Sequence, residues 1–114
     1  MKPPKPLERH LQATVLRHLK KLREGDSRLA FRKRHGGPLG IAGDPDIHGV
    51  WAGVPFAIEL KRTGEEPTVL QRTRIREWET AGALVGVVHD MNELQEILDV
   101  IQKKIPKSQI SRGH

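Results

Sequence analysis

Two acidic residues and one lysine in this chain have the types and spacing that could support catalysis. Asp46 precedes one apolar segment, and Glu59 and Lys61 lie two residues apart in the next. Between these segments, Ala52 and Gly53 fit the two-residue turn that hairpins favour. Counting outward along the two strands places Asp46 opposite Glu59. Because side chains alternate along a strand, Lys61 shares the face of Glu59, so two carboxylates and one amine are predicted to converge.

Facing carboxylates repel each other, so this arrangement predicts a compensating cation. Mg²⁺ (or Mn²⁺) prefers oxygen ligands, and Mg²⁺ is usually held by one or two carboxylates plus water and phosphate. The carbonyl of Ile58 is a further candidate ligand. Such an ion would activate a water while the ammonium of Lys61 stabilised charge growing on a phosphate, which is the chemistry of phosphodiester hydrolysis.

The same residues have a structural alternative. Asp46 follows Pro45 and is compatible with a turn, and Glu59 and Lys61 are compatible with ordinary exposed strand charges. The otherwise apolar residues 56–60 and the wholly apolar strand expected at 84–88 argue against it. They indicate a sheet buried on both faces, where an unpaired charge is costly.

Hydrophobic periodicity and turn residues predict the elements that must position these side chains. Apolar residues at helical spacing predict helices over 7–25, 68–81 and 91–105. Shorter apolar runs predict strands over 29–32, 47–51, 54–62 and 84–88, with the last of these central in the sheet. This order indicates one α/β domain over residues 1–105, a mixed β-sheet flanked by helices. Residues 106–114 form a basic tail that is predicted to be disordered.

The composition limits the class of protein without deciding it. The 114 residues include 20 Lys and Arg against 14 Asp and Glu, a net charge of +6, and the pI is near 10.1. A polyanion is the natural partner, although an inert basic surface fits the same numbers. The absence of Cys excludes a disulfide framework and a thiolate metal site. With no bilayer-spanning apolar run and no secretory signal, we expect an intracellular protein, cytoplasmic or nucleoid-associated.

Two groups of cations could contact a phosphate backbone. Arg32, Lys33 and Arg34 precede a glycine-rich segment and form the strongest candidate patch, and Arg72 lies on the helix expected beside the carboxylates. The basic residues near the end of the first helix fit equally well a solvated helix end favoured by the dipole. With two Phe, two Trp and no Tyr in the chain, base stacking is not expected, and recognition of backbone and shape fits better.

The segments Gly43-Asp44-Pro45-Asp46 and Ile58-Glu59-Leu60-Lys61 resemble the motif of the PD-(D/E)xK nuclease superfamily. With its flanking elements, from Leu7 to about Val88, the chain is more specifically similar to the virus-type replication-repair nuclease domain, VRR-NUC, in its stand-alone form. The resemblance implies a restriction-endonuclease-like core and a nuclease activity that depends on Mg²⁺ (or Mn²⁺).

The resemblance also implies roles for two outer residues. Glu8 on the first helix would join the two acids as a metal ligand, and Gln71 would help to place the catalytic lysine or a phosphate. Without the family, Glu8 is equally a first-turn acid beside the helix dipole, and Gln71 has capping-box spacing from Thr68. His48 is predicted to share the face of the first acid, as a proton carrier or, more simply, as a partly buried structural histidine.

These features favour a metal-dependent, structure-selective DNA endonuclease that acts on four-way (Holliday) junctions or flaps. The resemblance to stand-alone VRR-NUC domains implies a homodimer that presents two active sites to branched duplex DNA. A nucleic-acid-binding module without catalysis is the first alternative, and a subunit that cleaves only with a partner chain is the second. Metal-dependent cutting distinguishes the enzyme from the module.

Overall fold

The computed structural model describes residues 6–34 and 40–106, with side chains from residue 9 onward. The elements, in chain order, are α1 (Pro6–Gly25), β1 (Leu29–Lys33), β2 (Ile47–Trp51), β3 (Val54–Leu60), α2 (Val69–Thr80), β4 (Leu84–Val88) and α3 (Met91–Lys104). Their bounds lie within about two residues of the predicted ranges, the usual uncertainty of helix and strand ends. Within the described residues, no helix combines the length and apolarity needed to cross a bilayer.

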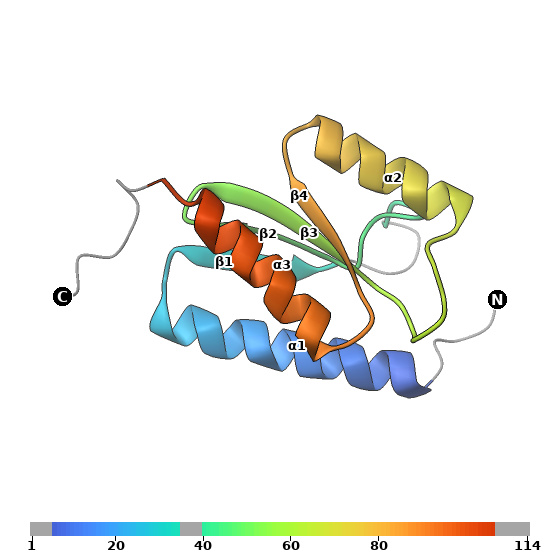
Figure 1. Ribbon diagram of the computed structural model, residues 1–114, viewed down its shortest axis with the longest axis horizontal. Coiled ribbons are helices and arrows are strands. Elements are labelled where there is room, and N and C mark those ends of the chain that lie inside the picture. Colours follow the sequence, from blue (N-terminus) through green and yellow to red (C-terminus); the bar gives the residue numbers. More distant parts are fainter. Residues whose placement is uncertain (1–5, 35–39, 107–114) are drawn as a thin grey trace.

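One mixed sheet contains the strands in the order β1-β2-β3-β4 (Figure 1), which confirms the predicted α/β class. β1 pairs antiparallel with β2, and β2 with β3, whereas β3 and β4 run parallel. The prediction that residues 84–88 lie centrally was wrong, because β4 is at the edge of this sheet. Its apolar composition has another cause, since both α2 and α3 contact β4.

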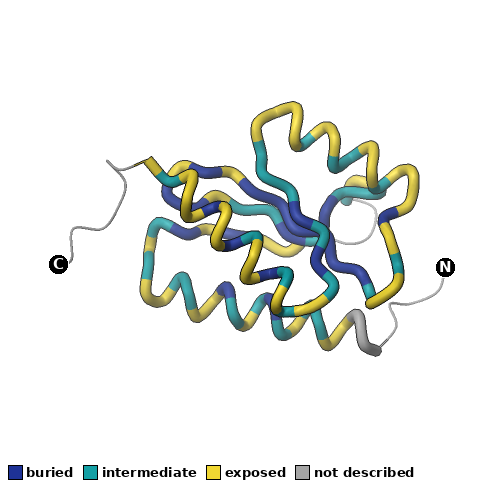
Figure 2. Tube along the Cα trace, in the orientation of Figure 1, coloured by how far each residue is buried: buried dark blue, intermediate teal, exposed yellow. Residues whose placement is uncertain are grey.

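The core lies between the sheet and the two helices α1 and α3, which contact each other. Leu19 of α1, Leu98 of α3 and Phe56 of β3 are all buried there. The cross-strand partners Ile47 and Ile58 belong to the same cluster. Figure 2 shows the buried stretches running through the middle strands and along the inner sides of these helices. The alternate residues of β2 and β3 therefore face the other side of the sheet, where α2 lies.

The β2–β3 hairpin turns at the predicted residues and has the predicted register. Its two turn residues, Ala52 and Gly53, have φ of 47° and 88°, as the type I′ turn of twisted hairpins requires. Trp51 pairs with Val54 on either side of this turn. Because a shift of one residue would move every side chain to the opposite face, the turn fixes which residues of β3 face α2.

α2 covers the second face of the sheet only in part. The helix begins with a capping box in which the Thr68 hydroxyl accepts the N–H of Gln71 and the Gln71 carboxamide oxygen accepts the N–H of Thr68. No residue of α2 is buried, and Leu70, expected in its apolar stripe, is 44% exposed. The outward side of β1 and β2 consequently stays open, with Val50 46% exposed.

Candidate active site

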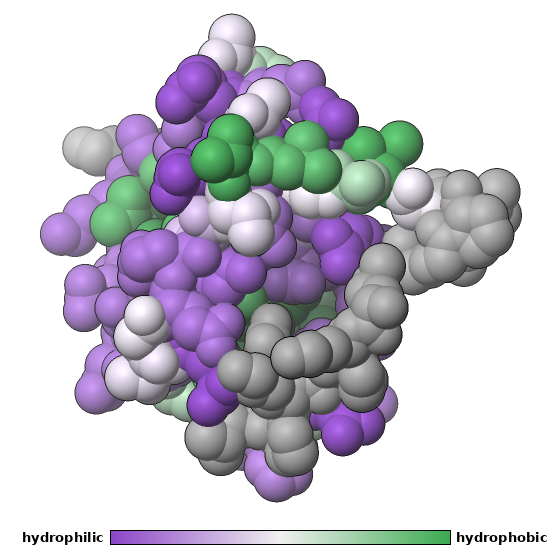
Figure 3. Space-filling model, turned by 90° about the vertical axis from the view of Figure 1, so that its right-hand side faces the viewer, coloured by the Kyte–Doolittle hydropathy of each residue, from purple (hydrophilic) through white to green (hydrophobic). Residues whose placement is uncertain are grey.

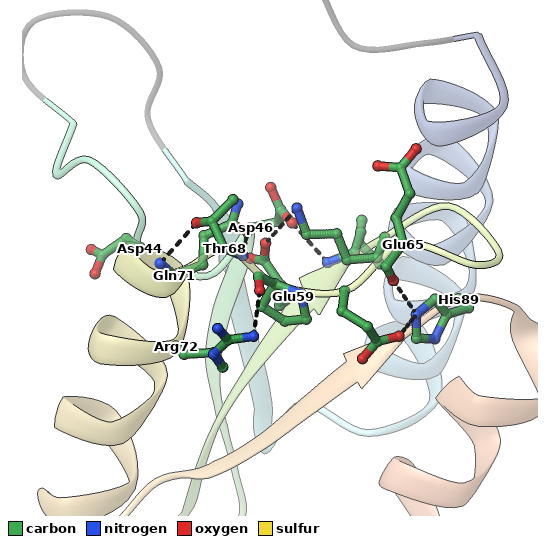
Figure 4. A network of polar contacts seen from close by, with 12 residues as sticks. Asp44, Asp46, Glu59, Glu65, Thr68, Gln71, Arg72 and His89 are labelled. Carbon is green, nitrogen blue, oxygen red and sulfur yellow. Dashed lines mark hydrogen bonds and ion pairs between the residues drawn. The ribbon is translucent and has the colours of Figure 1, made fainter.

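Asp46 lies immediately before β2, where the pairing of β2 with β3 ends. Its carboxylate continues the hydrogen bonding at this point, since Oδ2 accepts the backbone N–H of Leu60 at 2.7 Å. The backbone carbonyl of Asp46 accepts the N–H of Arg34 at 2.6 Å. Asp46 is thus hydrogen-bonded both to β3 and to the residue that follows β1. These bonds hold its carboxylate beside Glu59 (Figure 4).

Glu59 carries its carboxyl group into the interior. The residue is 2% exposed, and its Oε1 has no hydrogen-bond partner among the residues that the structure describes. Burial, and then repulsion from Asp46, raise the pKa of Glu59 to about 8, whereas Lys61 and Arg34 act in the opposite sense. The Lys61 Nζ lies 3.9 Å from Glu59 Oε2, longer than a hydrogen bond. The lysine therefore neutralises the carboxyl pair only in part.

This carboxyl pair fits a divalent cation. A buried oxygen without a partner, next to a second carboxylate, is costly unless positive charge compensates it, and a hard cation supplies that charge through oxygen ligands. Within residues 9–34 and 40–106, no group of three or more acidic or histidine side chains could hold a metal. Two carboxylates are sufficient for Mg²⁺, which usually keeps water and phosphate in its other positions.

Two further ligands proposed from the sequence lack a described contact with the pair. Glu8 belongs to α1, but its side chain lies outside the described residues. The side chain of Ile58 is buried in the core cluster, on the face of β3 opposite to Glu59. Its carbonyl lies on the strand between the two faces, and metal ligation by that carbonyl stays a prediction.

The segment before β2 is fixed by contacts with α2 and β1. Trp78 Nε1 donates a hydrogen bond to Asp44 Oδ1 at 3.2 Å, and Arg74 Nε donates to the carbonyl of Ala42 at 3.1 Å. The Arg34 guanidinium donates to the carbonyl of Asp44 at 2.8 Å. Asp44 therefore lies in the loop before β2, and its contacts orient the chain where it enters the site.

Gln71 lies near the acids in the first turn of α2, where Figure 4 shows it beside Thr68. Its carboxamide oxygen accepts the N–H of Thr68 at 2.8 Å, which is the capping role considered from the sequence. The guanidinium of Arg72 donates to the carbonyl of Pro67 at 2.9 Å, and Arg72 is exposed. Arg72 is thus an exposed cation at the start of α2, and catalysis by Gln71 stays a prediction.

Strand alternation divides the basic run that precedes the glycine-rich segment. Arg32 pairs with His48 and therefore faces the α2 side, whereas Lys33 pairs with Ile47 and faces the core side. Directly paired residues share a face, so strand alternation places Arg32 and Lys33 on opposite faces, and phosphate binding by Lys33, which is exposed, stays a prediction. Arg34 holds the loop before β2, and Arg32 is the exposed cation that faces the α2 side.

His48 lies on the predicted face and packs there as a structural histidine. Its ring centroid is 4.3 Å from that of Trp78. Its Nε2 is buried and has no hydrogen-bond partner within the described part of the chain. The ring thus serves the packing of α2 against the sheet, and a role as proton carrier stays a prediction.

Sequence reasoning missed the two side chains that hold the approach to the site. Arg34 was expected only to bind phosphate and Trp78 was given no role at the site, yet both donate hydrogen bonds to Asp44. Their partner lies 10 residues away from one and 34 from the other along the chain. No periodicity or motif spacing marks pairs so far apart, so the sequence held no signal for them.

The described residues thus form a mixed sheet flanked by helices, with Asp46 and Glu59 side by side at the open end of the β2–β3 hairpin. A solved structure described as a VRR_NUC domain is similar to this chain with a TM-score of 0.66 at 22% sequence identity, over 83% of this chain and 97% of the other. No family model matches the sequence, and no curated protein matches it significantly. The chain has the VRR-NUC fold, as its sequence resemblance predicted.

Proposed function

We propose that this chain is a metal-dependent nuclease that hydrolyses phosphodiester bonds in DNA. The observation that carries the proposal is the buried Glu59 carboxyl, which has Asp46 and Lys61 beside it and an oxygen without a partner among the described residues. A purely structural protein would gain nothing from this arrangement, because burying the Glu59 carboxyl beside Asp46, with no partner for Oε1 among the described residues, costs stability. The VRR-NUC fold supports the same proposal.

Each residue of the site has a distinct role in this proposal. Asp46 and Glu59 would hold Mg²⁺ (or Mn²⁺), which when bound acidifies a water and neutralises charge on the phosphate. Lys61, only 9% exposed, would stabilise the charge that develops on the phosphate oxygens. Arg34 adds positive potential at Glu59. Because Glu59 must ionise to act as a ligand, metal binding is expected to release a proton near neutral pH.

We further propose that the preferred DNA is branched, a four-way junction or a flap. The face of the molecule in Figure 3 is largely hydrophilic, with a hydrophobic band across its upper part. At the start of α2 and in the loop before β2, Val69 is 73%, Leu70 44% and Ile41 56% exposed. Exposed aliphatic side chains beside the exposed cation Arg72 suit the irregular shape of a branch better than the regular surface of an intact duplex.

A homodimer is part of this proposal. The open side of β1 and β2 has a groove of about 470 Å³, lined by residues that include Arg32, Val50, Pro55 and Trp78. An apolar sheet face of this kind suits burial by a second copy of the chain. Light scattering is expected to report a dimer for the wild type and a monomer for Val50→Asp, which places a charge in the groove. A monomeric wild type would contradict the dimer.

Cleavage of labelled linear, flap and four-way DNA in Mg²⁺, Mn²⁺ or EDTA tests the proposed activity. The wild type is expected to cut with either metal, to prefer branched DNA, and to be inactive in EDTA. Glu59→Gln and Lys61→Ala are expected to lower kcat by on the order of 100-fold or more. The matched controls Glu96→Gln and Lys103→Ala, at exposed positions of α3, are expected to keep full activity.

Three other outcomes would change the conclusion. Equal activity of the wild type and the two site variants would remove the catalytic assignment. Binding of DNA without metal-dependent cuts would support a non-catalytic nucleic-acid-binding module. Cutting that needs an added cell lysate would support a subunit that is active only with a partner.

A further inference from the structure

His89 joins two segments of the chain next to the lysine of the site. It follows β4, and its ring contacts Glu93 at the start of α3. It also contacts the connection formed by residues 61–68, where Figure 4 shows it beside Glu65. Nδ1 is 2.7 Å from Glu93 Oε1, and Nε2 is 2.8 Å from the carbonyl of Glu65 and 3.1 Å from Glu66 Oε2. The side chain of His89 is 17% exposed, so water competes little for these contacts.

Both ring nitrogens of His89 face oxygen acceptors. A neutral imidazole has one N–H, so its second nitrogen would direct a lone pair at an oxygen lone pair. The imidazolium donates from both nitrogens and satisfies both sides at once. The Glu65 carbonyl and the Glu93 carboxylate raise the pKa of His89 above its ordinary value, in agreement with this chemistry.

These contacts hold the segment that leads from Lys61 to α2. The N–H of Lys61 donates to the carbonyl of Val88 at 3.0 Å, one residue before His89. After Lys61 the chain leaves the sheet and reaches the N-cap of α2 at Thr68. The hydrogen bond from the Glu65 N–H to the Arg62 carbonyl is local to this connection, whereas the contacts of His89 tie the connection to α3.

We propose that the His89 imidazolium is a positioning residue that fixes the 61–68 connection and thereby aims Lys61 at the carboxyl pair. We call the contacts of His89 with Glu93, Glu65 and Glu66 the clamp. The clamp is a property of the folded chain alone, whereas its effect on catalysis rests on the proposed nuclease function. Loss of the proton removes the hydrogen bond on one side of the ring. The connection then loosens, and the contribution of His89 to kcat falls as pH rises through its titration.

The charged side chains around His89 are mostly acidic, which favours the imidazolium. They come from the connection, from the start of α3 and from the residue after β3, and they are Glu65, Glu66, Asp90, Glu93, Lys61 and Arg62. Arg62 is paired with Glu65 at 3.1 Å, so its charge is partly offset. The field at the ring therefore stays negative over the pH range of the titration.

NMR of the metal-free, full-length protein tests the clamp without DNA. The ¹⁵N shifts are expected to show both ring nitrogens of His89 protonated, with a titration midpoint above the ordinary value for histidine. The amides of residues 61–68 are expected to lose protection from hydrogen exchange as His89 loses its proton. A midpoint at or below the ordinary value, or protection that does not change with the titration, would overturn this proposal.

His89→Gln tests the catalytic consequence, with His10→Gln as the matched control. His89→Gln is expected to lower kcat on the order of 10-fold or more, because a misplaced lysine loses near-attack geometry, with KM little changed. Its kcat is also expected to lose the decline that the wild type shows as His89 titrates. If His89→Gln fails to fold, the wild-type titration still decides the clamp.

The two hypotheses can fail separately. A wild type that cuts DNA, with a His89→Gln variant of unchanged kcat and pH profile, would overturn the positioning role while the nuclease stands. A wild type that cuts no DNA but shows the expected coupling by NMR would overturn the proposed function while the clamp stands.

Discussion

Replacing Glu59 by glutamine tests the buried acid pair directly. Glutamine keeps the size of the side chain but cannot ionise, so it removes both the cost of burying a charge and the repulsion from Asp46. In the metal-free wild type, that burial and repulsion raise the pKa of Glu59 from 4.5 to about 8. The folded state then binds this proton more tightly than the unfolded state does, so the stability of the wild type must fall as pH rises from 4.5 toward 8.

The pKa change sets the size of the expected effect. A rise from 4.5 to about 8 corresponds to a folding cost of about 5 kcal/mol once Glu59 is fully ionised. About 4 kcal/mol of this cost has developed by pH 8, a large part of the roughly 5–15 kcal/mol that is typical of the stability of a whole domain. Glu59→Gln lacks this cost, so in EDTA it is expected to be more stable than the wild type by up to about 4 kcal/mol near pH 8.

Urea unfolding across that pH range, in EDTA, measures the difference. Adding Mg²⁺ is expected to stabilise the wild type and leave Glu59→Gln unchanged, because only the former gains a carboxylate ligand. Glu96→Gln, at an exposed position of α3, controls for the loss of one acidic charge. The reasoning is refuted if the wild type and Glu59→Gln share one pH dependence, or if the glutamine variant is the less stable protein at the alkaline end.

Three further substitutions separate structure from catalysis. Gln71→Ala removes the capping-box acceptor and is expected to cost about 1 kcal/mol in urea unfolding; a loss of kcat at full stability would support its predicted catalytic role, and an unchanged kcat would contradict it. Trp78→Phe removes the N–H that binds Asp44 and is expected to weaken Mg²⁺ binding in calorimetry; unchanged affinity would show that this anchor does not position the acids. Asp26→Asn weakens the ion pair with Arg28 at the hairpin-turn end of the sheet and is expected to cost about 1–3 kcal/mol at neutral pH without changing cleavage. Because Arg28 lowers the pKa of Asp26, this stabilisation is present above the ordinary pKa and is lost as pH falls through the lower folded value, so urea unfolding of the two proteins should converge in acid.

The sequence by itself determined the hairpin and, with it, the pairing of Asp46 with Glu59. A two-residue connection that ends in glycine, between two strand-forming segments, fixes how the residues on either side of it pair. The start of α2 was determined in the same way, because Thr68 and Gln71 satisfy each other within one helical turn. These features were predictable because the interactions behind them join residues close together in the chain.

The tertiary structure alone decided the surroundings of the site. An apolar run has the same sequence pattern whether neighbouring strands or helices bury it. Only the structure therefore shows that β4 is at the sheet edge and is covered by α2 and α3. The unpartnered Oε1 of Glu59, the bond from Trp78 to Asp44 and the clamp at His89 likewise depend on segments brought together by folding. The contacts of Trp78 and His89 each close a long loop of chain, which costs conformational entropy. The packed core as a whole offsets that cost. The two residues in contact therefore need no characteristic spacing that a single sequence could display.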